Sequence, residues 1–386
     1  MAVTLPDHDL LARLVSFDST SAKSNVPIAD FVCDYLAGTN VEILRLPTAN
    51  DSKVNLVIRV LPPNHRGEQR DGLILSGHLD VVPATEPDWS TNPFELAETA
   101  SDYIGRGACD MKGFDALAIN IAKRASEGNL TRPLLLILTC DEELGMLGAL
   151  HFAETWTSPF PLPKSAIVGE PTSLRVVRMH KGQLKMRLTC HGKSAHTGYP
   201  DLGINAIEPA ARAVCALADL RRKLRAEPTA TSEFFPETPF VALNVTMIDG
   251  GTATNIVPDR CRVEISIRTM PGMTPAPLVQ RVRAAVADCG DLGDYSLEQT
   301  GYGPPLLTEE DAPIYRGLCK LADQRDTYGV SYASDAGPLQ QMGLQCVLFG
   351  PGNIEVAHKP NESLPKKEFA RARELLDQVV REYCGA

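Results

Sequence analysis

Three short runs of apolar residues, each bounded by polar residues, constrain the fold more than any other feature of the sequence. They span Leu73 to Leu75, Leu134 to Leu138 and Ala166 to Val168. Runs of this length without polar alternation are typical of strands that are buried on both faces of a parallel sheet. A helical stretch, Asp115 to Ser126, lies between the first two runs. This succession predicts an α/β domain with a mostly parallel sheet flanked by helices.

The periodicity changes from about Gly182 onward. Leu184 to Cys190 alternates apolar and polar residues, as a strand with one solvated face does. The following segments continue as a helical stretch, two more alternating segments and a second helix, namely Asn205 to Ala226, Phe240 to Ile248, Arg260 to Arg268 and Pro275 to Cys289. These elements suffice for a separate small α+β unit.

The C-terminal part returns to the α/β pattern with the helical segment 312–323, a strand at 345–349 and a helix at 366–383. A chain of 386 residues exceeds the size at which single cores stop growing, about 250–300 residues. We therefore predict a catalytic domain made of residues 1–179 and 293–386, with residues 180–292 inserted as a second domain.

Composition and charge exclude several classes of function. The net charge of -10 is spread along the chain, so no basic stripe is available for nucleic acid. The longest apolar run, near Leu134 to Leu138, is far shorter than the ~20 residues of a membrane span. The N-terminal residues lack the features of a secretory signal, which predicts a cytoplasmic protein. Ten cysteines without a CxxC pair predict that any metal site uses histidine and carboxylates.

His78 and Asp80 directly follow the first apolar run. Ligands bind at the carboxyl ends of strands in open α/β sheets, and residues two apart lie on one side of an extended backbone. Asp80 could accept the second ring N–H of His78 and so support it as a metal ligand. A surface or purely structural role is the alternative for so short a motif.

Two acidic motifs follow the next elements. Asp110 lies in a glycine-rich turn before the helix that starts near Asp115, and its alternative role is that of an acid favoured at a helix N-terminus. Glu142 and Glu143 end the second apolar run behind a further acid, Asp141. Three adjacent acids repel one another unless a cation or solvent compensates, so either a metal site or a solvated loop is expected.

Two further motifs complete the set. Glu170 closes the third apolar run, and the segment from Gly350 through Gly352 to His358 lies near the C-terminus. All of these residues are predicted at strand ends or in adjoining loops. Two imidazoles and three carboxylates favour zinc over magnesium.

With these motifs in order, the chain resembles the peptidase M20 family of two-zinc aminoacylases and carboxypeptidases, over essentially its whole length. The resemblance implies a zinc-exopeptidase-like domain with an inserted ferredoxin-like lid that also forms a homodimer. It implies two divalent ions, zinc or alternatively cobalt, held by His78, Asp110, Glu143, Glu170 and His358. Asp110 would bridge the ions, Glu142 would be the general base and Asp80 the support of His78.

The inserted unit carries motifs that resemble those of the family's lid. His196 in Gly192 to Thr197 would reach the partner's active site and stabilise an oxyanion. Asn255 and Arg268 would hold the substrate carboxylate, to which a guanidinium is suited. Gly350 and Gly352 would line the substrate site. The alternatives are a loop histidine and a solvated arginine at a strand end.

Within the family, the segments around Trp89, Lys181 and His358 look most like those of acetylornithine deacetylases. The expected reaction is hydrolysis of N2-acetyl-L-ornithine to L-ornithine and acetate, a step of arginine biosynthesis. Succinyl-diaminopimelate, another N-acyl amino acid such as acetylcitrulline, or a dipeptide are alternative substrates. A non-catalytic metal-binding relative is the alternative from another class. The expected partners are thus a small N-acyl amino acid and a second copy of the chain, with no nucleic acid and no membrane.

Overall fold

The computed structural model describes residues 4–63, 71–128, 130–157 and 160–385, and it divides into two compact units. The first unit comprises Met1–Arg178, Thr308–Tyr328 and Ser334–Ala386, and the second comprises Met179–Leu307 and Gly329–Ala333. The second unit extends past the predicted boundary at residue 292. The reason is strand β12 (Asp294–Gly303), which pairs with β9 (Gly182–His191) and therefore belongs to the inserted sheet.

The larger sheet has nine strands in the order β1-β2-β6-β3-β7-β15-β8-β13, and β14 also pairs with β8. The pairs β3–β6, β3–β7 and β7–β15 are parallel, whereas antiparallel pairs flank them. This confirms the predicted α/β fold with a mostly parallel centre. The strands are β1 (Glu42–Pro47), β2 (Val54–Val60), β3 (Leu73–His78), β6 (Leu134–Thr139), β7 (Ser165–Val168), β8 (Val177–His180), β13 (Leu306–Leu307), β14 (Tyr328–Val330) and β15 (Gln345–Leu348).

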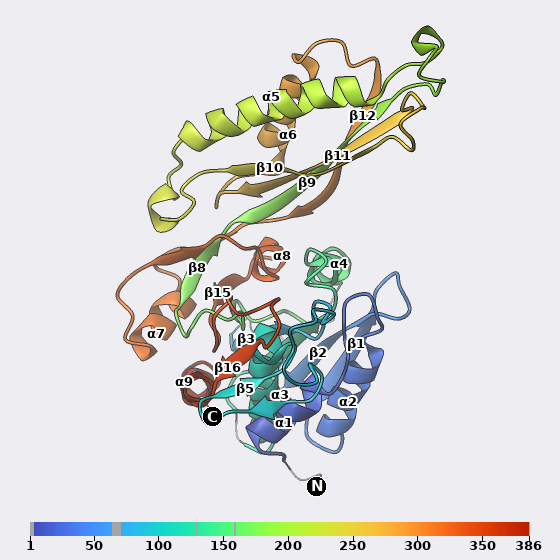
Figure 1. Ribbon diagram of the computed structural model, residues 1–386. Helices are drawn as coiled ribbons and strands as arrows, with labels where there is room; N and C mark the ends of the chain where they lie inside the picture. The colour runs from blue at the N-terminus through green and yellow to red at the C-terminus, as the bar shows by residue number, and fades with distance from the viewer. Residues whose placement is uncertain (1–3, 64–70, 129, 158–159, 386) are drawn as a thin grey trace. The chain divides into compact units, whose positions relative to one another are not determined.

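Helices cover both faces of this sheet within the first unit (Figure 1). On β2, Leu56 and Ile58 belong to the core that includes helix α3, whereas the amide of Asn55 donates to the Gly148 carbonyl of helix α4. Successive residues of a strand point to opposite faces, so α3 and α4 lie on opposite sides. The helices are α1 (Asp7–Val15), α2 (Val26–Leu36), α3 (Gly113–Ser126), α4 (Leu147–Thr155), α7 (Pro313–Leu321), α8 (Ala336–Gln341) and α9 (Lys366–Cys384).

Helix α3 is buried almost all round, with 13 of its 14 residues buried. Its Phe114 ring packs against Gly169, where a Cβ atom would lie only 2.0 Å from the ring. This contact joins the start of α3 to the loop after β7. A third, small sheet of β16 (Ser363–Pro365), β5 (Asp102–Ile104) and β4 (Ala97–Glu98) lies beside this region in the chain's first unit. The segments preceding α3 and following β7 are therefore held in fixed relation.

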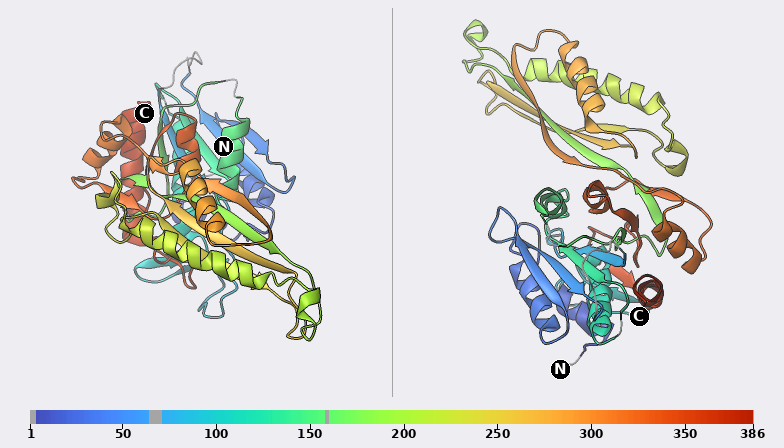
Figure 2. Two further views of the ribbon diagram at one scale, coloured as in Figure 1. Left: turned by 90° about the horizontal axis from the view of Figure 1, so that it is seen from above. Right: turned by 180° about the vertical axis from the view of Figure 1, so that it is seen from behind.

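The second unit has its own sheet, in the order β10-β11-β9-β12, and its own core. β10 (Ala242–Gly250) and β11 (Arg260–Thr269) join β9 and β12, and the alternating burial of β9 and β11 matches the predicted alternation. Helices α5 (Ile207–Ala226) and α6 (Pro275–Ala287) lie side by side on one face (Figure 2). The βαββαβ order confirms the ferredoxin-like inserted domain.

None of the helices in the described part of the chain combines the length and apolar character that a membrane span requires.

The side chain of Asp115, in the first turn of α3, generates a testable consequence for stability. It is fully buried, and both oxygens are without a hydrogen-bond partner among the described residues. Burial raises its pKa from 3.8 to about 8. Between these two values the folded state holds a proton that the unfolded state has lost, so stability falls as pH rises through this window.

We therefore expect Asp115→Asn to raise the melting temperature of the metal-free protein, because the amide cannot ionise. The gain should amount to several degrees at pH 8 and shrink toward pH 4, as differential scanning calorimetry across this range would measure. A gain in melting temperature that did not depend on pH would contradict the raised pKa of Asp115.

Candidate metal centre

His78 is the last residue of β3 and is buried. Its Nδ1 lies 2.9 Å from the Asp80 carbonyl oxygen, and because a carbonyl can only accept, Nδ1 carries a proton. Nε2 therefore faces Asp110, 3.1 Å from Oδ1. When one ring nitrogen of a histidine donates a hydrogen bond that fixes the ring, the other nitrogen is the usual metal-binding atom.

Asp110 lies between two imidazoles. It follows Gly107, whose φ of +79° is accessible mainly to glycine, and lies at a kink in the segment Ala108–Lys112, where its own backbone is non-helical (φ -121°, ψ 91°). Its Oδ2 is 3.2 Å from Nε2 of His358, while its Oδ1 faces His78. A carboxylate with one nitrogen on each oxygen has the arrangement expected of a bridge between two ions.

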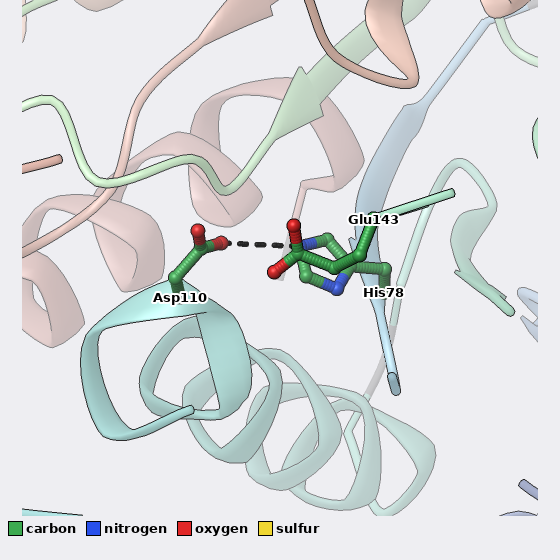
Figure 3. Close-up of side chains that lie close together, drawn as sticks. All are labelled: His78, Asp110 and Glu143. Atoms are coloured by element: carbon green, nitrogen blue, oxygen red, sulfur yellow. Dashed lines mark hydrogen bonds and ion pairs between the residues drawn. The ribbon is translucent and has the colours of Figure 1, made fainter. Parts of the chain in front are cut away.

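Glu143 completes this group. His358 Nε2 lies 2.9 Å from Glu143 Oε1, and ligand atoms of His78, Asp110 and Glu143 lie within 4.8 Å of one another. Figure 3 shows these three side chains converging, with the dashed line marking the contact between Asp110 and His78. The structure thus brings four of the five predicted ligands, His78, Asp110, Glu143 and His358, into contact with one another.

Asp80 holds the turn of acids rather than the ring of His78. Its carboxylate accepts hydrogen bonds from the backbone N–H of Glu142 (3.1 Å) and Glu143 (3.3 Å) and from the Ser21 hydroxyl (2.7 Å). Its nearest oxygen is 3.7 Å from His78 Nδ1, which is instead satisfied by the Asp80 carbonyl. Asp80 therefore contacts the backbone of the predicted base and of its neighbouring ligand.

The third acid of the turn, Asp141, is paired with a buried lysine. Lys53 is only 4% exposed, and its Nζ lies 2.5 Å from Asp141 Oδ1 and donates to the Ser21 carbonyl. Asp141 also adopts a positive φ of 53°. The turn of three acids is therefore stabilised by one cation from β1–β2, which sequence reasoning did not assign.

Two more carboxylates face the same space. Glu170, just after β7, and Asp335, which precedes α8, are both buried. The Thr139 hydroxyl donates to Asp335 Oδ2 at 2.5 Å, and Asp335 Oδ1 has no hydrogen-bond partner within the described ranges. Sequence reasoning missed Asp335 because no apolar strand directly precedes it. Its only sequence signal is an acid between small residues, Ser334 and Ala336.

The electrostatics of this cluster show a site short of positive charge. Burial, together with the neighbouring carboxylates, raises the pKa of Glu142, Glu143 and Glu170, and burial raises that of Asp335 to about 7. The hydrogen bonds of Asp110 and Glu143 raise the pKa of His358 to about 10. For His78, burial acts to lower the pKa, but Asp110 outweighs it and leaves the pKa well above its ordinary value.

These residues fit a pair of divalent cations. Several carboxylates crowd into one partly buried space, and the two imidazoles gain protons there because the surroundings favour positive charge. Metal ions supply that charge in place of protons, and binding then releases the protons. Mixed nitrogen and oxygen donors are the set that zinc accepts.

Gly350 and Gly352 both have a packing reason to lack a side chain. A Cβ at Gly350 would lie 2.6 Å from the Glu170 carbonyl oxygen, and one at Gly352, whose φ is +89°, would lie 2.4 Å from Cys109 Sγ. These glycines therefore let the loop after β15 approach the loops that carry Glu170 and Asp110. Their contact with substrate stays a prediction.

In the second unit, His196 and Asn255 lie together beyond one end of the sheet. The Thr197 amide donates to the Asn255 carbonyl, and His196 forms a bridge with Ile256. The Gly198 N–H donates to His196 Nδ1 at 3.0 Å. Since Nδ1 accepts this bond, the ring proton of His196 resides on Nε2. Both side chains are exposed.

Arg268 lies at the opposite end of that sheet. His196 and Asn255 precede Arg260, the first residue of β11, whereas Arg268 is eight residues further along the same strand. At about 3.4 Å per residue this separation is about 27 Å. The second unit of one chain therefore does not bring Asn255 and Arg268 together, and one small carboxylate cannot contact both in the same copy.

The fold and the site together define an α/β protein with an inserted domain and a candidate metal centre at the carboxyl ends of its parallel strands. A family model described as peptidase family M20/M25/M40 matches residues 74–382. An acetylornithine deacetylase from Myxococcus xanthus is 33% identical over 389 residues, and one from Pectobacterium carotovorum is 33% identical over 397 residues, each with 100% of both chains covered.

Solved structures share the fold. An M20 family metallo-carboxypeptidase from Sulfolobus solfataricus superposes with a TM-score of 0.80 at 17% identity, covering 98% of this chain and 99% of that one. A dinuclear metal-binding peptidase of the M20 family from Bacillus subtilis superposes with a TM-score of 0.67 at 15% identity, covering 98% and 99%. The chain belongs to peptidase family M20/M25/M40 and is an amidohydrolase of that family.

Proposed function

We propose that the protein removes the acetyl group from N2-acetyl-L-ornithine, using two divalent metal ions. The observation that carries the proposal is Asp110, whose two oxygens face His78 and His358 while Glu143 lies beside them. The full-length relatives named acetylornithine deacetylase support the choice of substrate.

The metal ions would be held by the predicted ligands His78, Asp110, Glu143, Glu170 and His358, with zinc as the proposed ion and cobalt as a substitute. Glu170 is included because it is buried and its pKa is raised by burial and by Asp110, so it lies in the same cluster. When bound, such ions supply Lewis-acid activation of water and of the acyl carbonyl.

Glu142 is the proposed general base. Its carboxylate has no hydrogen-bond or ion-pair partner in the described part of the chain, while its backbone N–H is held by Asp80. An unpaired carboxylate with a raised pKa can take a proton from the attacking water and return it to the departing amine. The products are then acetate and the free amino acid.

His196 is the proposed donor to the oxygen that becomes negative during attack. With Nδ1 accepting from Gly198, its Nε2–H is available as a neutral hydrogen-bond donor. Arg268 is proposed to bind the substrate carboxylate with its guanidinium. Because Asn255 and His196 lie about 27 Å or more from Arg268 in one copy, they are proposed to enter the site of a partner subunit.

The second unit offers an edge suited to such a dimer. β10 is the terminal strand of its sheet, and Met247 and Ile248 on it are 64% and 56% exposed. An exposed apolar edge strand readily pairs with a second chain. We propose a homodimer through this edge. The cytoplasmic location stays a prediction.

Replacing Glu142 with Gln tests the proposed base. We expect kcat to fall by about 10²–10⁴-fold, because the amide cannot accept the proton, while zinc binding by calorimetry is retained. Wild-type protein loaded with the same metal is the control. Activity equal to the wild type would refute the role of Glu142.

A mixing experiment tests the shared site. His196→Ala and Arg268→Ala should each be nearly inactive as homodimers. After the two are unfolded and refolded together, statistical pairing gives heterodimers with one intact site, and activity should recover to about a quarter of the wild type. Recovery absent from verified heterodimers would show that both residues act within one copy.

The substrate assignment is tested with a panel on metal-loaded wild type: acetylornithine, acetylcitrulline, succinyl-diaminopimelate, acetylmethionine and a dipeptide. We expect the highest kcat/KM for acetylornithine. A preference for another member would overturn the assignment but keep the amidohydrolase chemistry. Failure of the dialysed protein to bind zinc or cobalt would overturn the metal-dependent proposal itself.

A further inference from the structure

Glu362 is a buried carboxylate that the proposed chemistry does not use. It is 1% exposed and lies four residues after His358, before strand β16. Its Oε1 accepts the backbone N–H groups of Cys109 and Asp110, both at 2.9 Å. Its Oε2 accepts the Gly107 N–H at 3.0 Å and Arg106 Nη1 at 2.9 Å.

Three of these four donors are the backbone amides of Gly107, Cys109 and Asp110, in the loop that carries Asp110. Successive N–H groups that converge on one point form an anion-binding concavity, and Glu362 supplies the anion. The Glu362 carbonyl also accepts the Gly105 N–H at 3.0 Å. The loop therefore takes its shape around this one residue.

Arg106 compensates the charge of Glu362 and anchors it from the other side. Its Nη2 donates to the Pro83 carbonyl at 3.0 Å and to Glu86 at 3.1 Å, and its guanidinium stacks on the Trp89 ring at 5.1 Å. Arg106 is itself only 1% exposed. Glu362 is thus held between a rigid cation and the Asp110 loop.

We infer that Glu362 is a positioning residue that sets the affinity of the metal pair, an inference that rests on the proposed function. Glu362 shares a loop with His358 and binds the backbone of Asp110, so it couples two ligand segments that are remote in sequence. Asp110 needs both of its oxygens placed, one toward each imidazole. A small shift of its backbone would misplace both at once.

The test is a calorimetric titration of the full-length, metal-free protein with Zn²⁺ alone, repeated with Co²⁺ and read by its visible absorption. Glu362→Gln keeps the size of the side chain but turns an N–H group toward the Gly107 amide and Arg106, which are themselves donors. We expect metal affinity to fall by about 10–100-fold, as for other residues that orient ligands. At limiting metal kcat should fall and recover as metal is added, with KM unchanged.

Asn120→Ala is the matched control. Asn120 is fully buried in α3 and hydrogen-bonded to Tyr35, Leu5 and Asp7, away from the Asp110 loop. The Asn120→Ala substitution should lower the melting temperature without changing metal affinity. Equal losses of affinity in the two variants would reduce Glu362 to a structural role and overturn the inference.

Arg106→Lys decides the question if Glu362→Gln does not fold. A single ammonium cannot contact Glu362, Pro83 and Glu86 together, so we expect a smaller loss of metal affinity in the same direction. Wild-type affinity in Arg106→Lys, or in a folded Glu362→Gln, would overturn the inference. If the wild type itself bound neither metal, the proposed function would fail instead.

Discussion

The fold places several carboxylates close together in one partly buried space, where they repel one another. This repulsion is the constraint that the rest of the site has to satisfy. Asp110 escapes this conflict because two imidazoles face its oxygens, which holds its pKa well below the ordinary value although burial alone would raise it. Glu142 and Glu170 have no such imidazole partner, and the contact of Glu143 with His358 does not offset its burial and the nearby Asp110, so the pKa values of all three rise. A folded chain keeps such an arrangement where cations complete it.

The remainder of the first unit serves to bring these charges together. β3, β6 and β7 are adjacent parallel strands, so their carboxyl ends deliver His78, the acid turn and Glu170 to one edge. Buried polar contacts then fix the loops: Asp80 and Lys53 hold the acid turn, and Glu362 holds the Asp110 loop. Each of these contacts is made by a charged side chain. Asp80 and Glu362 accept hydrogen bonds from backbone amides of the loops, and Lys53 pairs with the acid Asp141.

The second unit has a different physical design. It is a ferredoxin-like domain with its own core, and its functional candidates lie beyond one end of strand β11 (His196 and Asn255) and near the other end (Arg268). Because β11 is an extended strand, residues at its two ends are far apart in space. Asn255 and Arg268 of one copy therefore cannot contact the same small substrate. The same geometry suits a site completed by two copies.

The features that depend on neighbouring residues could be predicted from the sequence. Apolar runs identified β3, β6 and β7, and the residues at their ends identified His78, Glu143 and Glu170 as candidates, because strand direction alone places such residues at one edge. The order of motifs identified the family. The sequence did not reveal Lys53, Asp335 or Glu362, whose partners are remote along the chain and whose residue types are ordinary on a protein surface.

By itself, then, the sequence determined the class of the elements with a clear apolar period, the presence of an inserted domain and the ligand candidates, since these follow from local periodicity and from chemistry at strand ends. Only the tertiary structure decided that Asp80 holds the acid turn, that the inserted unit runs to Leu307 and that Arg268 lies far from Asn255. The physical reason is that hydrogen bonds and strand pairs between distant segments are settled by packing, which no local pattern of residues encodes.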